Sequence, residues 1–321
     1  MLSACSVVDA GAAEKITIIV GGINKLIYLP PKLAENLGYF KDEGLDVELQ
    51  SQQAGVDAEN ELLAGAAQAV VGFYDHAIDL QTKGKDVESI VIFGLVPGSV
   101  EMVRTDEAQR IKTMGDIRGK TLGVTALGSS STFLGQYLAS NYGLKTNEYS
   151  MLPVGAGNSL MAAIKQKRVD VAWTTEPTTS LLRASGDAKP LVDLSTIEGT
   201  KAALGGLYPA SSLYVTRDWA QAHQDDARKL ARAFVKTLQY IRSHSAEDIA
   251  AKMPADYYGG NKALYVQALK ASLPMYSPDG KMPQGGPETV LKVLSGFNPN
   301  IKGKHIDLPK TFTNEFVDEV K

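Results

Sequence analysis

The sequence contains a single cysteine, Cys5, among its 321 residues. One thiol excludes an internal disulfide and any metal site built from several thiolates. The chain also has no apolar run close to the roughly eighteen residues that a membrane-spanning helix needs. Because 33 basic side chains are balanced by 36 acidic ones and form no dense cluster, we expect no nucleic-acid partner. With 44% hydrophobic residues, the composition is typical of a globular chain that lies in water.

Familiar catalytic and cofactor-binding motifs are missing as well. Residues 115–121 (GDIRGKT) are one residue short of a P-loop and precede a strand, whereas that motif opens a helix. Residues 155–157 (GAG) lack the third glycine of a dinucleotide fingerprint. The four histidines are scattered without the spacing of metal ligands. We therefore expect a binding protein without cofactor or metal, and not an enzyme.

What the sequence does contain is an order of landmarks that occurs twice, about a hundred residues apart. The matched segments are residues 16–22 and 121–132, residues 60–64 and 158–162, and residues 71–73 and 171–173. Any α/β protein repeats strand–loop–helix units, so an accidental match stays an alternative. The preserved order favours an α/β fold of two similar lobes with a cleft between them.

The pattern of apolar residues predicts four strands in each lobe. They span residues 15–20, 46–50, 69–73 and 88–95 in the first lobe, and 122–125, 149–154, 169–173 and 190–194 in the second. Residues 102–104 are the predicted first crossing between lobes and residues 212–216 the predicted return. Two crossings form a hinge that permits closure over a ligand. The expected division is 1–14 as a tether, 15–103 plus 213–321 as lobe 1, and 104–212 as lobe 2.

Side chains that follow these strands are candidates for ligand binding, because open α/β sheets bind ligands at the carboxyl ends of their strands. On the first lobe they are Asn24, Tyr28, Tyr74, Asp75 and His76. On the second lobe they are Trp173, Thr174, Thr175 and Glu176. Trp173 could equally belong to the core. Asp75 and His76 form the only pair that could serve an enzyme of this fold as general acid and base.

The strongest candidate is the loop of Ser129, Ser130, Ser131 and Thr132 after Gly128, between a strand and a helix. Hydroxyl groups and free backbone N–H groups at a helix start form a set of donors that suits an anion. Helix capping would explain one of these residues without any ligand. Three serines and a threonine are more than a cap requires.

Cys5 lies in the segment Leu2-Ser3-Ala4-Cys5, the pattern at which bacterial lipoproteins are cleaved and acylated. A complete export signal also needs a basic segment and an apolar run upstream. We expect that the natural product is longer at its amino terminus and is exported. We further expect that it is held at a membrane by lipid on Cys5, facing the periplasm or the outside of the cell.

Residues 28–48 (YLPPKLAENLGYFKDEGLDVE) closely resemble the opening of a family of periplasmic solute-binding proteins. Its members bind nitrate, taurine, aliphatic sulfonates and thiamine-pyrimidine precursors. Residues 116–124, the serine loop and residues 169–177 add to the resemblance, which covers about residues 16–242. It implies the type II periplasmic binding protein fold, in which two lobes close over a ligand and present it to an ABC permease in the inner membrane.

By that resemblance, six of the candidates align with ligand-contacting loops of the family. They are Asn24, Tyr74, Ser129, Ser130, Trp173 and Thr174. The acidic Asp75 departs from what a simple inorganic anion would require. The chain also lacks the cysteine-rich segment of pyrimidine-precursor synthases with this fold.

Together these features predict the substrate-binding component of an ABC importer, monomeric, that captures a small organic anion such as a sulfonate or carboxylate. The alternative is a binder or enzyme of the same fold that acts on a thiamine-precursor pyrimidine or another heterocycle. A second alternative is a sensory domain whose partner is a receptor.

Overall fold

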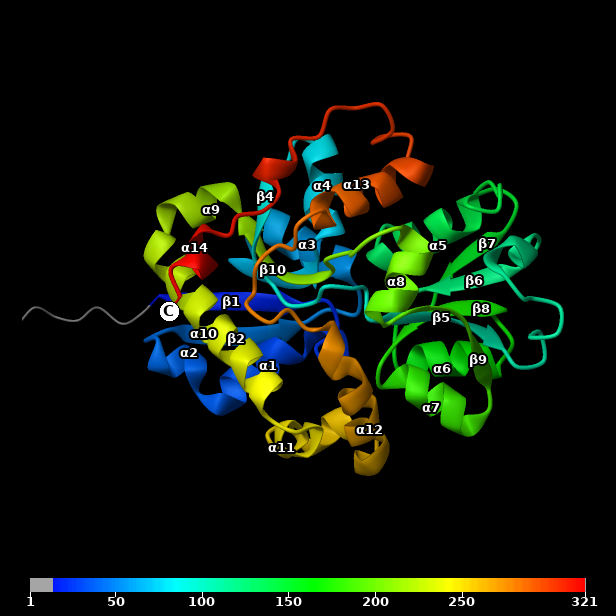
Figure 1. Cartoon of the computed structure of the whole chain (residues 1–321), viewed down its shortest axis with the longest axis horizontal. Helices are drawn as coiled ribbons and strands as arrows, with labels where there is room; N and C mark the ends of the chain where they lie inside the picture. Colours follow the sequence, from blue (N-terminus) through cyan, green and yellow to red (C-terminus); the bar gives the residue numbers. More distant parts are fainter. Residues whose placement is uncertain (1–13, 321) are drawn as a thin grey trace, which may run out of the picture.

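The computed structural model describes residues 14–320, which form two five-stranded sheets lying side by side (Figure 1). The strand order is β2-β1-β3-β10-β4 in the first sheet and β7-β6-β8-β5-β9 in the second. Helices cover the faces of both sheets. The predicted α/β fold of two lobes is confirmed.

The first sheet combines four strands of one direction with a single antiparallel strand. Its strands are β1 (Lys15–Val20), β2 (Asp46–Ser51), β3 (Ala69–Phe73), β4 (Val87–Ile92) and β10 (Ser211–Thr216). β1 pairs in parallel with β2 and β3, and β10 lies antiparallel between β3 and β4. Every residue of β3 and β4 is buried, as expected for strands covered on both faces.

The second sheet repeats this plan. Its strands are β5 (Ser99–Arg104), β6 (Thr121–Val124), β7 (Ser150–Pro153), β8 (Val171–Thr175) and β9 (Ala188–Leu194). β6 pairs in parallel with β7 and β8, and β5 lies antiparallel between β8 and β9. The doubled order of landmarks in the sequence therefore corresponds to two sheets of the same topology.

The passages between the sheets lie earlier in the chain than predicted. Residues 102–104 are the end of β5 in the second sheet, and residues 212–216 belong to β10 in the first. The chain passes over at residues 93–98 and returns between β9 and β10. The segment 99–104 is a buried strand that contains the charged residues Glu101 and Arg104. Charged residues are more typical of connections than of buried strands, so the sequence did not indicate a strand here. The lobe limits themselves stay a prediction.

Helices connect the strands of each sheet. The helices between the strands of the first sheet are α1 (Leu29–Leu37), α2 (Tyr39–Asp42), α3 (Gly55–Leu63) and α4 (Asp75–Thr82). Those around the second sheet are α5 (Ser130–Ser140), α6 (Asn158–Lys165), α7 (Thr178–Ser185) and α8 (Ile197–Leu204). The chain ends with α9 (Arg217–Ala222), α10 (Gln224–Ser243), α11 (Ala246–Ala251), α12 (Lys262–Ser272), α13 (Gly286–Phe297) and α14 (Glu315–Asp318).

Local sequence explains where two of these helices lie. Prolines at the start of α1 need no N–H partner, and Gly38 ends the helix with φ 81° in the left-handed region. α10 buries Leu230, Phe234, Leu238 and Ile241, the apolar stripe that the sequence shows at helical spacing. In α3, Leu62 is buried, whereas its neighbour Leu63 is 36% exposed.

The apolar core is continuous between the lobes. Phe73, at the end of β3, contacts Trp173 in β8 edge-to-face with ring centroids 6.3 Å apart. α13 packs on both α4 and α5 (Figure 1), and Phe297 meets Phe133 at 6.0 Å. The carboxyl-terminal part of the chain was expected to pack on the first lobe, but α13 also covers the second.

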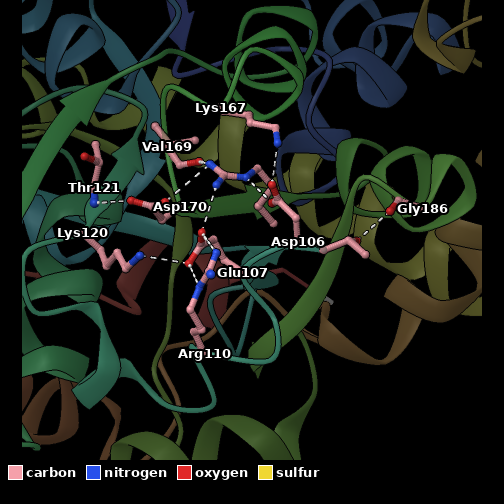
Figure 2. A network of polar contacts seen from close by, with 11 residues as sticks. Asp106, Glu107, Arg110, Lys120, Thr121, Lys167, Val169, Asp170 and Gly186 are labelled. Carbon is pink, nitrogen blue, oxygen red and sulfur yellow. Dashed lines mark hydrogen bonds and ion pairs between the residues drawn. The ribbon is translucent and has the colours of Figure 1, made fainter.

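A network of charges joins the amino ends of β6 and β8 to the segment that follows β5 (Figure 2). Glu107 accepts hydrogen bonds from Arg110 at 2.5 Å and Lys120 at 2.9 Å, and these cations lower the pKa of Glu107 to about 2. Asp170 accepts from the backbone N–H of Thr121 at 2.9 Å. These charges neutralise one another, so the network fixes strand ends rather than forming a ligand site.

In the part of the chain that the structure describes, no helix has both the length and the apolar character needed to cross a bilayer.

Candidate functional site

A cavity of about 340 Å³ lies where the two sheets face each other. Its wall includes residues that follow β1, β2, β7 and β8, together with a turn near residue 257. The lining residues are Gly22, Ile23, Asn24, Lys25, Ser51, Gln52, Gln53, Ala156, Gly157, Asn158, Met161, Glu176, Pro177, Thr178, Leu181, Asp256, Tyr257 and Gly259. The volume is within the usual range for small-molecule sites.

Lys25 brings a positive charge to this cavity. Its side chain is buried, and Nζ donates to the carbonyl oxygens of Gly21 at 2.6 Å and Gln53 at 3.4 Å. The ammonium also lies 5.7 Å from the centre of the Tyr28 ring. Among residues 14–320 it forms no ion pair, and burial lowers its pKa to about 8. The charge of Asp57 acts in the opposite direction but is outweighed by burial. A buried ammonium without a carboxylate in direct contact favours a bound anion.

The first turn of α6 faces the same cavity. Gly157 precedes the helix with φ 61° and ψ −129°, and no side chain caps the helix start. The free N–H groups of a helix amino terminus, with the helix dipole, favour negative charge. Because Gly157 and Asn158 line the cavity, α6 and Lys25 contribute favourable interactions for an anion from different lobes.

Glu176 lines the cavity on the side of the second lobe. One carboxylate oxygen accepts the backbone N–H of Ser180 at 3.0 Å, which caps the start of α7. Burial raises the pKa of Glu176. Its backbone carbonyl accepts the N–H of Leu26 at 2.9 Å, so the loops after β8 and β1 are joined here.

Asp75, His76 and Ser130 lie together, but they do not line the cavity. Ser130 Oγ donates to Asp75 at 2.7 Å and lies 3.4 Å from His76 Nε2. Tyr208 donates to the other oxygen of Asp75 at 2.7 Å. Ser130 belongs to α5 and Asp75 to α4, so this buried cluster links the two lobes. Burial raises the pKa of Asp75.

His76 is held as a cation inside this cluster. Its Nδ1 lies 2.5 Å from Glu59, and both side chains are almost completely buried. Burial acts to lower the pKa of His76, but the charge and hydrogen bond of Glu59 outweigh it and raise the pKa to about 9. A histidine that is protonated at neutral pH cannot serve as a general base there.

The hydroxyl groups of the serine loop have protein partners. Ser131 Oγ accepts from the backbone N–H of Thr125 at 3.0 Å, and Thr132 donates to the carbonyl of Ala126 at 2.8 Å. Ser129 Oγ accepts from Val56 N–H at 3.4 Å. α5 begins at Ser130, so three of the four hydroxyl residues belong to its first turn. The ligand role of this loop stays a prediction.

The remaining candidates are buried beside the cleft. Tyr28 and Trp173 each contact Phe73 edge-to-face, and Thr174 donates to the carbonyl of Val100 at 2.9 Å. Tyr74 forms a 2.5 Å hydrogen bond with Thr311 and so faces the carboxyl-terminal segment. Thr175 is 4% exposed at the end of β8. Of the thirteen predicted ligand-binding residues, only Asn24 and Glu176 line the cavity.

Cys5, the predicted lipidation site, lies outside the described residues.

A family model described as "NMT1/THI5 like" matches residues 29–248, more than half of the chain. The chain belongs to this family. The predicted relationship to periplasmic solute-binding proteins is therefore confirmed.

Solved structures share the fold of this NMT1/THI5-like chain over nearly its whole length. A solved structure from Bordetella bronchiseptica RB50 is 34% identical, with a TM-score of 0.91 over 95% of this chain and 96% of that one. The alkanesulfonate-binding protein SsuA from Xanthomonas axonopodis pv. citri, bound to MOPS, is 17% identical, with a TM-score of 0.70 over 95% and 99%. The putative binding protein YtlA of Bacillus subtilis (strain 168) is 20% identical over 99% of this chain and 93% of its own.

Sequence reasoning missed Lys25, Gln52, Gln53 and Asn158 in this NMT1/THI5-like chain. All four follow strands at the edge of the cleft, so the rule that selected Asn24 also covers them. Position after a strand does not by itself show which of the several polar residues there face the cavity.

Proposed function

We propose that the protein is the substrate-binding component of an ABC importer and captures a small organic anion, a sulfonate or carboxylate, in the cavity between the lobes. The observation that carries this proposal is Lys25, whose buried ammonium lines the cavity without an ion-pair partner in the described part of the chain. A bound anion would supply the missing counter-charge.

The expected affinity follows from the number of contacts. Hydrogen bonds that involve a charged group contribute roughly 1.5–3 kcal/mol each. Lys25 and the free N–H groups of α6 could supply three or four of them. Their sum approaches the roughly −8 kcal/mol of micromolar binding.

Binding would favour the closed arrangement of the lobes. Lys25 follows β1, whereas Asn158 and Glu176 follow β7 and β8. A ligand touches all of them only when the lobes approach, so it stabilises the closed form by its difference in affinity for the two forms. A solute-binding protein presents its ligand to a permease in this way.

Fold similarity supports the assignment to transport. SsuA from Xanthomonas is an alkanesulfonate-binding protein with the same architecture, and YtlA is called a putative binding protein. The proposal places the protein in the periplasm or on a membrane facing it, as a monomer that contacts an ABC permease and carries lipid on Cys5.

The test is a thermal-shift screen of sulfonates and carboxylates, followed by calorimetry with Lys25→Met. Methionine keeps the length of the side chain and removes its charge, so the affinity for an anion that binds wild type should fall at least tenfold. Lys85→Met is the matched control, because Lys85 is exposed and distant from the cavity lining. Equal affinity in all three proteins would refute the role of Lys25.

The pH dependence supplies a second readout of the same experiment. Lys25 carries its charge below a pKa of about 8 in the free protein. Anion affinity should therefore be constant at lower pH and fall by up to tenfold per unit above pH 8, until the pKa of the complex is passed. Lys25→Met should abolish this decline.

A further inference from the structure

The cavity contains four carboxamide side chains. Asn24 follows β1, Gln52 and Gln53 follow β2, and Asn158 begins α6 in the second lobe. Each carboxamide offers two N–H donors and one carbonyl acceptor. The set therefore presents donors and acceptors to the same cavity from both lobes.

These groups have unused hydrogen-bonding capacity. Within residues 14–320, the side chains of Asn24, Gln53 and Asn158 are exposed and form no hydrogen bond with another protein group, and Gln52 has one contact of 3.5 Å to Glu61. Other carboxamides of the chain connect segments of the protein. Gln81, for example, forms bonds of 2.7 and 3.0 Å with the backbone of Asp307.

A purely aliphatic ligand would fit this lining poorly. It would remove the carboxamides from water without replacing their hydrogen bonds, and each such group left unpaired costs free energy. A site equipped to hydrogen-bond its ligand rejects analogues that lack the matching groups.

We propose that the ligand is an organic anion whose body carries amide or ring N–H and C=O groups, with Gln52, Gln53 and Asn158 as the residues that determine specificity. This rests on the proposed function. Lys25 holds the anionic group, and the carboxamides bind the body of the ligand. The nitrogen heterocycles and acylated amino acids are the chemical classes that satisfy both requirements.

The carboxylates near the cavity do not supply the same selectivity. Glu176 already accepts the N–H of Ser180 at the start of α7, and Asp256 is the only other carboxylate among the lining residues. A ligand that carried a free ammonium group would instead depend on these two residues. That possibility is separated from the proposal by the choice of probes.

The test uses pairs of anions that match in charge and size. N-acetylglycine and pentanoate have the same chain length but differ in the amide group, and orotate and benzoate differ in the polarity of a six-membered ring. Calorimetry should show at least tenfold tighter binding of the polar member of a pair. Gln53→Ala and Asn158→Ala should reduce that ratio severalfold while the affinity for the apolar member changes less than twofold.

Gln166→Ala is the matched control, because Gln166 is an exposed carboxamide at the opposite end of α6. Equal or tighter binding of the apolar members would overturn this inference and leave the proposed function intact. Tighter binding of β-alanine than of N-acetylglycine would also overturn it, in favour of an ammonium group held by Glu176. Failure of every anion to bind, with Lys25→Met unchanged from wild type, would overturn the proposed function itself.

Discussion

Glu101 is a buried carboxylic acid in the second lobe. Its side chain is completely buried in β5, and in the described chain neither carboxylate oxygen has a hydrogen-bond partner. Burial raises its pKa to about 8. The acid is therefore protonated in the folded protein at neutral pH, whereas in the unfolded chain it ionises near its ordinary value.

This difference predicts how stability depends on pH. Between the unfolded value and about pH 8 the folded state binds one more proton at Glu101, so stability falls as pH rises through this window. Glu101→Gln should remove the decline and stabilise the protein at pH 8 by more than about 1 kcal/mol. Urea denaturation at pH 5 and pH 8 measures both effects.

The control is Glu14→Gln, which neutralises an exposed carboxylate at the start of the described chain. It should leave the free energy of unfolding nearly unchanged at both pH values. A loss of stability in Glu101→Gln at pH 8 would contradict this prediction, because it would mean that the carboxyl group makes a stabilising interaction in the folded protein.

Residue identity in the site could be predicted only in part. Asn24 and Glu176 were found because polar side chains after strands are candidates wherever two sheets face each other. Lys25 was not selected, because its burial depends on Gly22. A Cβ at Gly22 would lie 2.5 Å from Lys25 Cε, and the backbone there has φ 112°. Such a contact between neighbours in sequence has no signature in composition or spacing.

At the level of elements, α6 depends on an unusual residue before its first turn. Gly157 combines φ 61° with ψ −129°, a conformation that is essentially restricted to glycine. A Cβ at this position would contact nothing within 4 Å, so any penalty for a side chain comes from the backbone alone.

Gly157→Ala should therefore destabilise the protein by about 1–3 kcal/mol and weaken anion binding by moving the start of α6. Denaturation and calorimetry check the two effects. Gly119→Ala is a suitable comparison, because Gly119 also has positive φ, 70°, and open surroundings, but it lies outside the cavity lining. Equal losses of affinity in both variants would argue against a contribution of α6 to binding.

Most elements could be predicted from periodicity, and β3 was predicted with its observed limits. The exceptions have physical reasons. β5 was taken for a connection because two of its six buried residues are charged. α8 has a weak signal in the sequence, because its short segment, IEGTKAAL, contains a glycine that helices usually avoid.

On the scale of the whole molecule, the hydrogen bond from Ser130 to Asp75 connects α5 with α4. Replacing Ser130 with alanine leaves one oxygen of a buried carboxyl group without its donor, at a cost of about 1–3 kcal/mol. This cost arises only where the lobes are together. Ser130→Ala should therefore favour the open form, increase the radius of gyration in small-angle X-ray scattering and weaken ligand binding.

Ser131→Ala provides the comparison. Ser131 bonds to Thr125 within the second lobe, so its loss should lower stability without changing the radius of gyration. If Ser130→Ala has the scattering profile and affinity of wild type, the bond between lobes has no influence on closure.

The overall architecture could be predicted from the sequence more completely than the site or the single elements. The doubled order of landmarks predicted two lobes, and the two sheets indeed share one topology. The position of α13 could not be predicted, because nothing in its own residues indicates that it packs on helices from both halves of the chain.

That position of α13 limits how the molecule can move. Phe297 of α13 touches Phe133 of α5, while another part of the same helix rests on α4. Any rotation that separates α4 from α5 must expose one of these apolar contacts to water. Part of the resistance to opening therefore comes from a helix that does not line the ligand cavity. A chain that stopped before residue 286 would lose this restraint and would sample wider separations of its halves.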